Sequence, residues 1–172
     1  MRLYRYVGPK RIADRAGAEV AGAVVRRAED VVAWARDSGQ VLVGGRVTAT
    51  FVIDVTGELL IADRRSEHVA CAGGRPVRSA GEMTFALDDG VEAVEVSNQS
   101  TGYCPEPESW PAVAEALARA GLLGPGGFAP SCNFRRCEKC GSINLIKGGV
   151  LECGVCAAEL PAAYNVQGAD PD

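Results

Sequence analysis

The stretch RVTATFVIDVTGELLIAD, residues 46–63, contains two runs of strand-forming residues separated by a short connection. The first run is rich in β-branched residues and the second in aliphatic ones, as is typical of β-strands. The connection Val55-Thr56-Gly57 ends in glycine, which allows the backbone conformations of a tight turn. We therefore predict a β-hairpin over 46–63 and expect it to form the centre of the fold.

The stretch MTFALDDGVEAVEVS, residues 83–97, predicts a second hairpin. Its central Asp89-Gly90 is a turn signal between two runs of strand-forming residues. Two hairpins that follow one another in the sequence favour a single antiparallel sheet. Helical patterns occur on both sides of them, so we predict an α+β fold with a hairpin-based antiparallel sheet and flanking helices.

Helix signals flank the two hairpins. Residues 28–38 carry acidic side chains in the first turn, an apolar face and a following glycine. Residues 109–120 begin with a capping serine and a proline, and a glycine follows them. Nearer the N-terminus we expect a strand over 3–7 and a helix over 9–16, whereas 20–26 fits either a strand or the start of the next helix.

The overall composition is that of a globular protein. Of 172 residues, 47% are apolar and 23% are charged, which excludes a disordered chain, a collagen-like repeat and a coiled coil. The sequence has no apolar run of the roughly 18 residues that a membrane span needs. The N-terminus does not have the pattern of a secretory signal. We accordingly expect no membrane partner and a cytoplasmic location.

Charge and cysteine content narrow the classes of function. The chain carries 18 basic and 22 acidic residues, a net charge of −4, and it has no basic tract of the kind that binds nucleic acid. Its seven cysteines are an odd number, which argues against complete disulfide pairing and favours a reducing compartment. We therefore expect a protein partner rather than a nucleic acid.

A change of composition divides the chain. The sequence GPGGFAP, residues 124–130, contains mainly turn-forming residues. We predict an α+β domain over 1–124, a Gly/Pro linker over 125–130, a small C-terminal domain over 131–165 and a frayed tail over 166–172. About 40 residues are too few for a stable apolar core, so the small domain needs another source of stability.

Two Cys-x-x-Cys pairs supply that source. Cys137 and Cys140 form the first pair and Cys153 and Cys156 the second, with twelve residues between the pairs. One such pair is compatible with redox chemistry or with buried free thiols, whereas two pairs at this spacing favour a tetrahedral metal site. The pattern resembles the zinc ribbon family over residues 132–160, and this resemblance implies a zinc site with four cysteine ligands.

We expect one structural zinc ion, because four protein thiolates leave no open coordination position for catalysis. Iron in a rubredoxin-like site is the alternative that the same geometry accepts. Gly141, directly after the first pair, allows the backbone to turn beneath the sulfur atoms. Residues 143–146 and 150–152 are strand-like and 147–149 is a turn, so we predict a hairpin between the two cysteine pairs.

Two polar loops follow the predicted hairpins and hold reactive side chains. His68, the single histidine, lies in the first loop, and Cys104 lies in the second. If the loops meet at one end of the sheet, His68 can deprotonate Cys104 for nucleophilic catalysis, with Glu67 or Asn98 orienting the imidazole ring. The same residue types also serve as hydrogen-bonding and packing residues, so both interpretations stay open.

A second metal site is the other enzymatic interpretation. His68, Cys71 and Cys104 offer three ligands to a second zinc ion with an open position for water, while Glu67 or Glu106 would move protons. The order of helix, hairpin, histidine loop, strand, cysteine loop and helix resembles the zinc nucleoside deaminase family. The chain departs from that family's motif, because Glu67 precedes His68 and no second cysteine follows Cys104.

Two longer runs, IADRRSEHVACAGG (61–74) and SNQSTGYCPEPESWP (97–111), together with the terminal ribbon, make the whole chain similar to uncharacterised bacterial proteins. This resemblance supports the two-part layout and implies no activity. The function that we expect is a small cytosolic zinc-binding accessory protein that acts through a protein partner. The alternative is an enzyme, a hydrolase or deaminase-like zinc protein, that uses His68 and Cys104.

Overall fold

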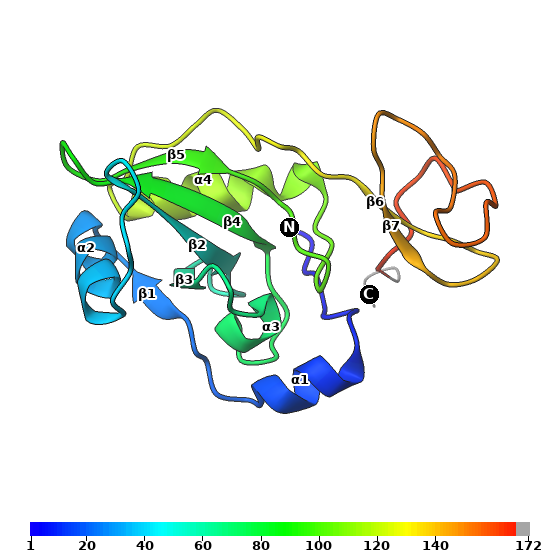
Figure 1. Cartoon of the computed structure of the whole chain (residues 1–172), viewed down its shortest axis with the longest axis horizontal. Helices are drawn as coiled ribbons and strands as arrows, with labels where there is room; N and C mark the ends of the chain where they lie inside the picture. The colour runs from blue at the N-terminus through cyan, green and yellow to red at the C-terminus, as the bar shows by residue number, and fades with distance from the viewer. Residues whose placement is uncertain (168–172) are drawn as a thin grey trace.

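The larger part of the chain folds around one antiparallel sheet. The computed structural model describes residues 1–167. Its main sheet has five strands in the order β1-β3-β2-β4-β5, and every neighbouring pair is antiparallel (Figure 1). The strands are β1 (Ala23–Val25), β2 (Arg46–Ile53), β3 (Leu59–Asp63), β4 (Ser79–Ala86) and β5 (Glu92–Val96). The predicted α+β class with a hairpin-based antiparallel sheet is confirmed.

Both predicted hairpins are present. β2 and β3 are paired until Ile53 faces Leu59, and the carboxylate of Asp54 accepts hydrogen bonds from the N–H groups of Thr56 (2.8 Å) and Glu58 (2.9 Å). This side-chain acceptor replaces main-chain partners that the turn cannot supply. β4 and β5 form the second hairpin, with one register shift that marks a β-bulge.

Helices precede, interrupt and follow the sheet strands. They are α1 (Lys10–Ala16), α2 (Ala28–Asp37), α3 (His68–Cys71) and α4 (Trp110–Arg119), and a 3-10 turn, η1 (Pro107–Ser109), leads into α4. The helices predicted over 9–16, 28–38 and 109–120 are therefore confirmed. The short helix α3 lies in a segment that the sequence analysis treats as a loop.

Two N-terminal segments depend on long-range pairing. The ambiguous segment 20–26 contains strand β1, because it finds a partner in β3. The strand predicted over 3–7 is reduced to one isolated bridge between Tyr4 and Val77. Local composition does not reveal such partners, since they are distant in the sequence.

Different helices cover the two faces of the sheet (Figure 1). Phe51 and Ile53 of β2 belong to the apolar cluster that contains Val113 of α4, whereas Val52 belongs to the cluster that contains Val69 of α3. This alternation follows from the two-residue period of a strand. Each of these side chains is at most 1% exposed. Since burying one such side chain contributes about 1.5–3 kcal/mol, these two clusters dominate the stability of the larger part.

The C-terminal region forms a second, smaller lobe with its own sheet (Figure 1). Its strands β6 (Phe134–Arg136) and β7 (Ile143–Leu145) are antiparallel. We call residues 1–124 the sheet domain and residues 131–165 the ribbon. The small second sheet lies next to the cysteine pairs, as the zinc-ribbon resemblance implies.

Strand pairing within the ribbon differs from the prediction. The hairpin predicted between 143–146 and 150–152 is wrong, because β7 pairs with β6, and Glu152 forms an isolated bridge with Glu159. The strand after each cysteine pair thus folds back on the strand before that pair. As a result, each Cys-x-x-Cys pair lies at the tip of its own hairpin.

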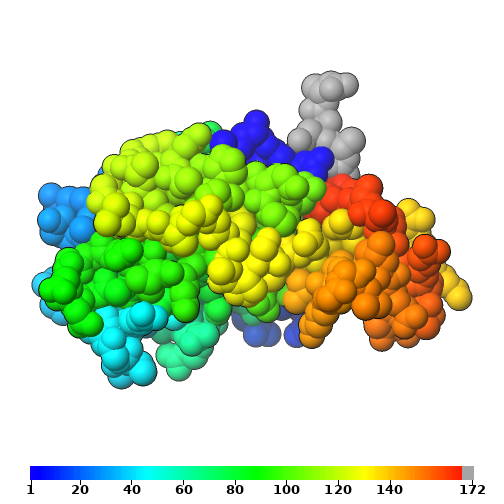
Figure 2. All heavy atoms as spheres, turned by 90° about the horizontal axis from the view of Figure 1, so that it is seen from above, coloured from blue at the N-terminus to red at the C-terminus, as the bar shows by residue number. Residues whose placement is uncertain are grey.

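The Gly/Pro segment, together with Leu123 just before it, lies against β5. The N–H of Ala93 donates to the carbonyl of Leu123 (2.9 Å), and the N–H of Ala129 donates to the carbonyl of Val96 (2.8 Å). The segment therefore follows the outer edge of β5 and leads into the ribbon (Figure 2, yellow). Covering an edge strand in this way satisfies main-chain groups that would otherwise be open to other chains.

The first two residues of the predicted frayed tail are held in place. Val166 is buried, and the amide of Gln167 donates to the carbonyls of Arg5 (2.9 Å) and Tyr103 (3.0 Å). The chain is therefore ordered through Gln167 and returns to the sheet domain after the ribbon. The remainder of that prediction, residues 168–172, lies outside the described residues.

Candidate metal centre

The first cysteine pair lies in the turn between β6 and β7. The N–H of Cys137 donates to the carbonyl of Ser142 (2.8 Å), and the N–H of Gly141 donates to the carbonyl of Cys137 (2.8 Å). Gly141 has a φ of 75°, in the left-handed region that glycine adopts without strain. The turn can therefore curl under the thiols of Cys137 and Cys140, as the sequence predicts.

The second cysteine pair repeats this construction. The N–H of Cys153 donates to the carbonyl of Ala158 (2.8 Å), and the N–H of Ala157 donates to the carbonyl of Cys153 (2.9 Å). Ala157 is equivalent to Gly141, and its φ is also positive, at 55°. A left-handed backbone is unfavourable for alanine, so the surroundings rather than local preference hold this turn.

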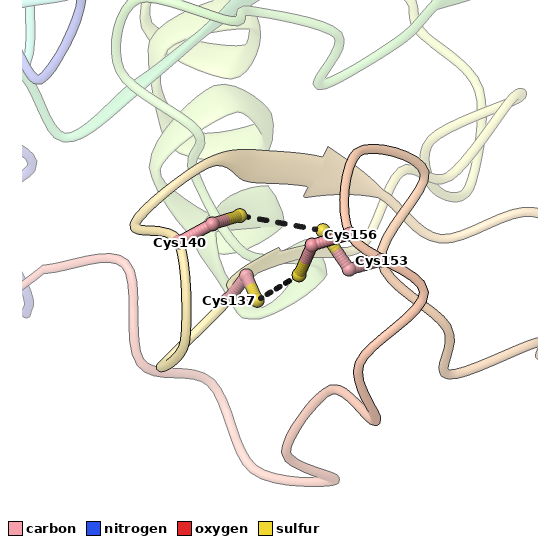
Figure 3. Close-up of side chains that lie close together, drawn as sticks. All are labelled: Cys137, Cys140, Cys153 and Cys156. Atoms are coloured by element: carbon pink, nitrogen blue, oxygen red, sulfur yellow. Dashed lines mark hydrogen bonds between the residues drawn. The ribbon is translucent and has the colours of Figure 1, made fainter.

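The two turns bring four sulfur atoms together (Figure 3). The sulfur atoms of Cys137 and Cys156 are 3.6 Å apart, those of Cys140 and Cys153 are 3.7 Å apart, and all four lie within 4.8 Å of one another. A disulfide needs a separation of about 2.05 Å, so these cysteines are not oxidised in pairs. Four sulfur atoms at about 2.3 Å from a central ion lie about 3.8 Å apart. The cluster therefore fits one tetrahedral metal ion.

Hydrogen-bond donors surround the sulfur atoms. The hydroxyl of Ser142 lies 3.1 Å from the sulfur of Cys140 and 3.2 Å from that of Cys153. The amide of Asn144 and the N–H of Val155 also donate to the sulfur of Cys153, at 3.6 and 3.4 Å. The Ser142 hydroxyl, with main-chain N–H groups of the second turn, lowers the pKa of Cys153 to about 5. These donors favour the thiolate form that a metal ligand requires.

A cation would relieve the repulsion within the cluster. Although the N–H of Ala158 favours the thiolate of Cys156, desolvation and the neighbouring thiols raise the pKa of Cys156 to about 11. Several thiolates this close repel one another, and a bound divalent ion removes that repulsion. Since the protein supplies all four tetrahedral ligands, the ion would have no open position and its role would be structural.

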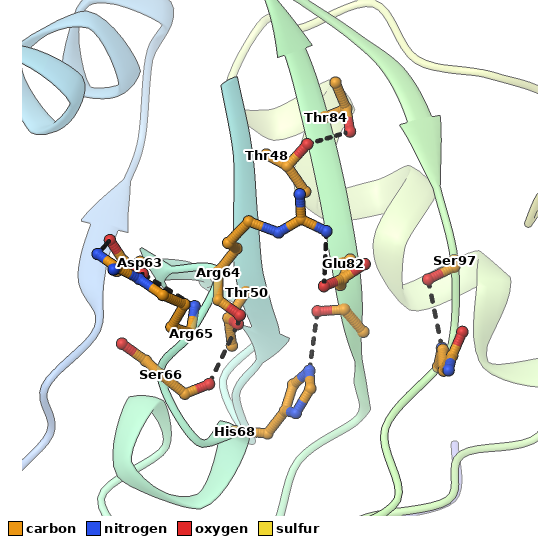
Figure 4. Close-up of polar contacts among 12 residues, drawn as sticks. Thr48, Thr50, Asp63, Arg64, Arg65, Ser66, His68, Glu82, Thr84 and Ser97 are labelled. Carbon is orange, nitrogen blue, oxygen red and sulfur yellow. Dashed lines mark hydrogen bonds and ion pairs between the residues drawn. The ribbon is translucent and has the colours of Figure 1, made fainter. Parts of the chain in front are cut away.

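The structure places His68 at the start of α3, where its ring points toward β4 (Figure 4). The ring atom Nε2 lies 2.9 Å from the carbonyl oxygen of Gly81, so Nε2 carries the proton and donates it. Desolvation by burial lowers the pKa of His68, which therefore favours the neutral ring. Glu67, the residue before the helix, is exposed. The bond to Gly81 assigns His68 a positioning role between α3 and the sheet.

Both cysteines of the sheet domain are buried thiols. Cys104 donates to the carbonyl of Thr101 (3.4 Å), and Cys71 lies 3.8 Å from the carbonyl of Leu60. Desolvation by burial raises the pKa of each thiol to about 12. A thiolate is the reactive form of cysteine, so this environment opposes nucleophilic chemistry at both positions.

The structure does not bring the expected second ligand set together. Within residues 1–167, the ribbon cysteines are the one group of at least three metal-ligating side chains whose ligand atoms lie within 4.8 Å of one another. The second zinc site expected from His68, Cys71 and Cys104 is therefore not formed. Catalysis by His68, Cys104 and Glu67 stays a prediction that rests on the sequence alone.

The polar loop after β5 contains a structural joint that the sequence analysis does not assign. The fully buried amide of Asn98 donates to the carbonyls of Pro105 (2.9 Å) and Cys132 (2.8 Å), and its oxygen accepts from the N–H of Cys132 (2.7 Å). The amide of Asn98 thus pairs with both main-chain groups of Cys132, as a residue of a neighbouring strand would. This pairing connects the sheet domain to the start of the ribbon. The sequence suggests Asn98 only as an orienting group for His68, because one polar residue among several carries little signal.

The far end of the ribbon has matching contacts that the sequence analysis also misses. The hydroxyl of Tyr164 donates to the carbonyl of Cys104 (2.8 Å). The side chain of Asn165 accepts from the N–H of Arg136 and donates to its carbonyl, both at 2.8 Å. Together, Asn98 and Tyr164 attach both ends of the ribbon to the sheet domain, whereas the bonds of Asn165 lie within the ribbon.

Comparison with protein-family models, with curated proteins and with solved structures finds no match to this chain. The zinc-ribbon resemblance therefore depends on the geometry of the cysteine cluster. The resemblance of the whole chain to bacterial proteins gains no support from these comparisons. Within residues 1–167, no helix combines the length and the apolar character that crossing a bilayer requires.

Proposed function

We propose that this chain is a small zinc-binding accessory protein that acts through a protein partner. The observation that carries the proposal is the cluster of four sulfur atoms, with separations of 3.6 and 3.7 Å in its two closest pairs. Four cysteine thiolates are a typical ligand set of structural zinc. Iron accepts the same ligands, so the identity of the metal is the first quantity to measure.

The zinc ion would hold the ribbon in shape. The apolar cluster around the sulfur atoms is small, with Leu160 as its one fully buried aliphatic side chain among the described residues. Metal binding contributes folding energy that so small a core lacks. A site closed by four protein ligands favours a binding role over catalysis at the metal.

The surface chemistry supports a protein as partner. Val155 is 74% exposed and lies between the two cysteines of the second pair, so the metal site would present an apolar side chain to solvent. In the sheet domain, Val41 and Val43 are 81% and 78% exposed. With Leu42 between them, Val41 and Val43 form a contiguous apolar surface, which favours a protein contact. The net charge of −4 supports a protein over a nucleic acid, which is bound through basic surfaces.

Metal analysis of the full chain tests the zinc site. We expect one zinc ion per chain in freshly purified protein, and a cobalt-substituted chain with the absorption of a tetrahedral thiolate site. Cys140→Ser should lose the metal, whereas Val155→Ala, a change in the second cysteine turn that leaves all four thiols, should keep it. A chain that carries iron, or no metal, would contradict the proposed zinc site.

Crosslinking in cells tests the partner. A photo-reactive amino acid is placed at Val41, Val150 or Val155, which are all strongly exposed. We expect a discrete crosslinked protein from at least one position, and the loss of any crosslink at Val150 or Val155 in a chain that also carries Cys140→Ser. The absence of a crosslink from all three positions, or a crosslink at Val150 or Val155 that survives Cys140→Ser, would count against a zinc-dependent accessory role.

A further inference from the structure

The outer sides of β6 and β7, the two edges of the ribbon sheet, differ in their main-chain hydrogen bonds. On the β6 side, the amide of Asn165 pairs with both main-chain groups of Arg136, and the guanidinium of Arg135 donates to the carbonyl of Phe134 (2.8 Å). On the β7 side, the ladder register identifies which main-chain groups are free. The N–H of Cys137 donates to the carbonyl of Ser142, which makes these two residues a hydrogen-bonded pair.

Hydrogen-bonded and non-hydrogen-bonded pairs alternate along an antiparallel ladder. Ile143 faces Arg136 and Leu145 faces Phe134. These two pairs are one and three positions further along the ladder than the hydrogen-bonded pair Cys137–Ser142. Both are therefore non-hydrogen-bonded positions, and their N–H and C=O groups point away from β6. Among the described residues, no main-chain partner approaches these groups from the other side. β7 thus has a free edge.

The side chains of this edge strand line a groove between the ribbon and the sheet domain. The groove encloses about 450 Å³. Its apolar lining is formed by Ile143 and Leu145 of β7, Phe134 of β6, and Val7 and Pro9 of the N-terminal segment. It is therefore continuous with the apolar contact that joins the two parts of the molecule.

One cation, Arg136, lies in the groove. The guanidinium of Arg136 donates to the carbonyls of Gly141 (3.2 Å) and Val166 (3.3 Å). In the part of the chain that the structure describes, Arg136 forms no ion pair. The bond to Gly141 places the guanidinium at the start of β7, so a carboxylate bound beside that strand can reach its remaining N–H groups.

We propose that the free edge of β7 binds an extended peptide segment of a protein partner, with apolar side chains at alternate positions and one carboxylate that pairs with Arg136. The proposal rests on the proposed function and names the chemistry of the partner. A strand added beside β7 shares its pleat, so every second side chain of the peptide enters the apolar groove. Main-chain hydrogen bonds to Ile143 and Leu145 would supply affinity, and the groove and Arg136 would supply specificity.

The chain's own last residues do not match this chemistry. Residues 168–172, Gly-Ala-Asp-Pro-Asp, include no large apolar side chain to fill the groove. They also contain a proline, which lacks the N–H that a central ladder position needs. An external segment is therefore the occupant that we propose, and deleting 168–172 should leave binding within twofold of the unaltered chain.

Fluorescence anisotropy with the zinc-loaded full chain tests the proposal. The probes are fluorescein-labelled heptapeptides in which valine alternates with threonine, with a single aspartate moved along the panel. We expect saturable binding for one placement of the aspartate. Arg136→Gln should weaken that binding at least tenfold, whereas Lys147→Gln, which removes an exposed ribbon charge outside the groove lining, should change it less than twofold.

A second pair of measurements isolates the strand edge. Ile143→Pro removes an N–H that points away from β6, so the ribbon ladder and the zinc content should survive while peptide binding is lost. Two further peptides carry N-methyl groups, one on its odd-numbered and one on its even-numbered nitrogens. Only one of these two sets of N–H groups faces β7, so one peptide should lose binding and the other should keep it. Saturable binding by no member of the panel, or binding unchanged by both Arg136→Gln and Ile143→Pro, would overturn the proposal.

The outcome is separable from that of the proposed function. A chain that carries zinc and forms a zinc-dependent crosslink, yet binds no peptide at β7, refutes the edge site and leaves the accessory role standing. A chain that lacks zinc refutes the proposed function directly, whatever the peptides do.

Discussion

The sheet domain and the ribbon differ in the physical means available to stabilise them. In the sheet domain, large side chains such as Phe51, Ile61 and Phe85 are fully buried in one continuous cluster. In the ribbon, two of the three buried residues of the apolar cluster are the cysteines Cys137 and Cys153. Apolar burial is distributed over many contacts, so losses are graded, whereas a four-ligand site depends on every ligand.

A separate apolar cluster joins the two parts. Cys104 of the sheet domain packs with Cys132 and Phe134 at the start of the ribbon and with Val166 after it. The hydrogen bonds of Asn98 reinforce this contact at its centre. The molecule therefore combines a core held by apolar burial, a lobe whose four cysteines can hold a metal, and a joint held by packing and polar pairing.

Removing the metal should have the largest effect. Structural zinc contributes on the order of 10 kcal/mol to the folding of such a module. Chelation, or Cys140→Ser, should collapse the NMR amide signals of residues 131–165 while those of the sheet domain keep their dispersion. Val155→Ala serves as the control. A ribbon that stays folded without metal would remove the contrast between the two regions.

Removing one buried ring from the core of the sheet domain should have the next largest effect. Phe51→Ala removes a fully buried ring and should lower the free energy of unfolding by about 3–5 kcal/mol in chemical denaturation. Zinc content per folded chain should not change. Val41→Ala, at an 81% exposed position, should stay within about 0.5 kcal/mol of the parent chain. A loss below about 1 kcal/mol at Phe51 would contradict the tight packing of this core.

Breaking the joint should have an intermediate effect with a distinct signature. Asn98→Ala leaves the N–H and carbonyl of Cys132 and the carbonyl of Pro105 without their partner, at a cost of about 2 kcal/mol. Hydrogen exchange at the Cys132 amide should accelerate, while zinc stays bound. Gln99→Ala, at the adjacent exposed position, is the matched control. Unchanged exchange at Cys132 would mean that packing alone holds the joint.

The two cysteine turns offer the smallest and most local test. Ala157→Gly relieves a left-handed backbone and should stabilise the zinc-bound ribbon by about 0.5 kcal/mol. Gly141→Ala introduces the same strain in the other turn and should destabilise the ribbon by about 1 kcal/mol. Competition with a chelator measures both. Changes of the same sign would contradict the equivalence of the two turns.

Local patterns in the sequence are sufficient for much of the fold. The hairpins over 46–63 and 83–97 and the helices over 28–38 and 109–120 were predictable, because turn, cap and strand signals act over a few residues. The strand pairing of the ribbon was not. β6, with the sequence Phe-Arg-Arg, carries two charged residues and gives little strand signal, so β7 was assigned to the wrong neighbour.

The sequence by itself determined the hairpin-based α+β class and the four cysteines of the candidate metal centre, since both follow from residue types at short, regular spacing. Only the tertiary structure decided what the isolated polar residues do. His68 bonds to a main-chain carbonyl, Cys71 and Cys104 are buried thiols, and Asn98 joins the two parts of the molecule. The physical reason is that the ionisation and partners of a side chain depend on burial and on contacts with residues far along the chain, which the spacing in the sequence does not encode.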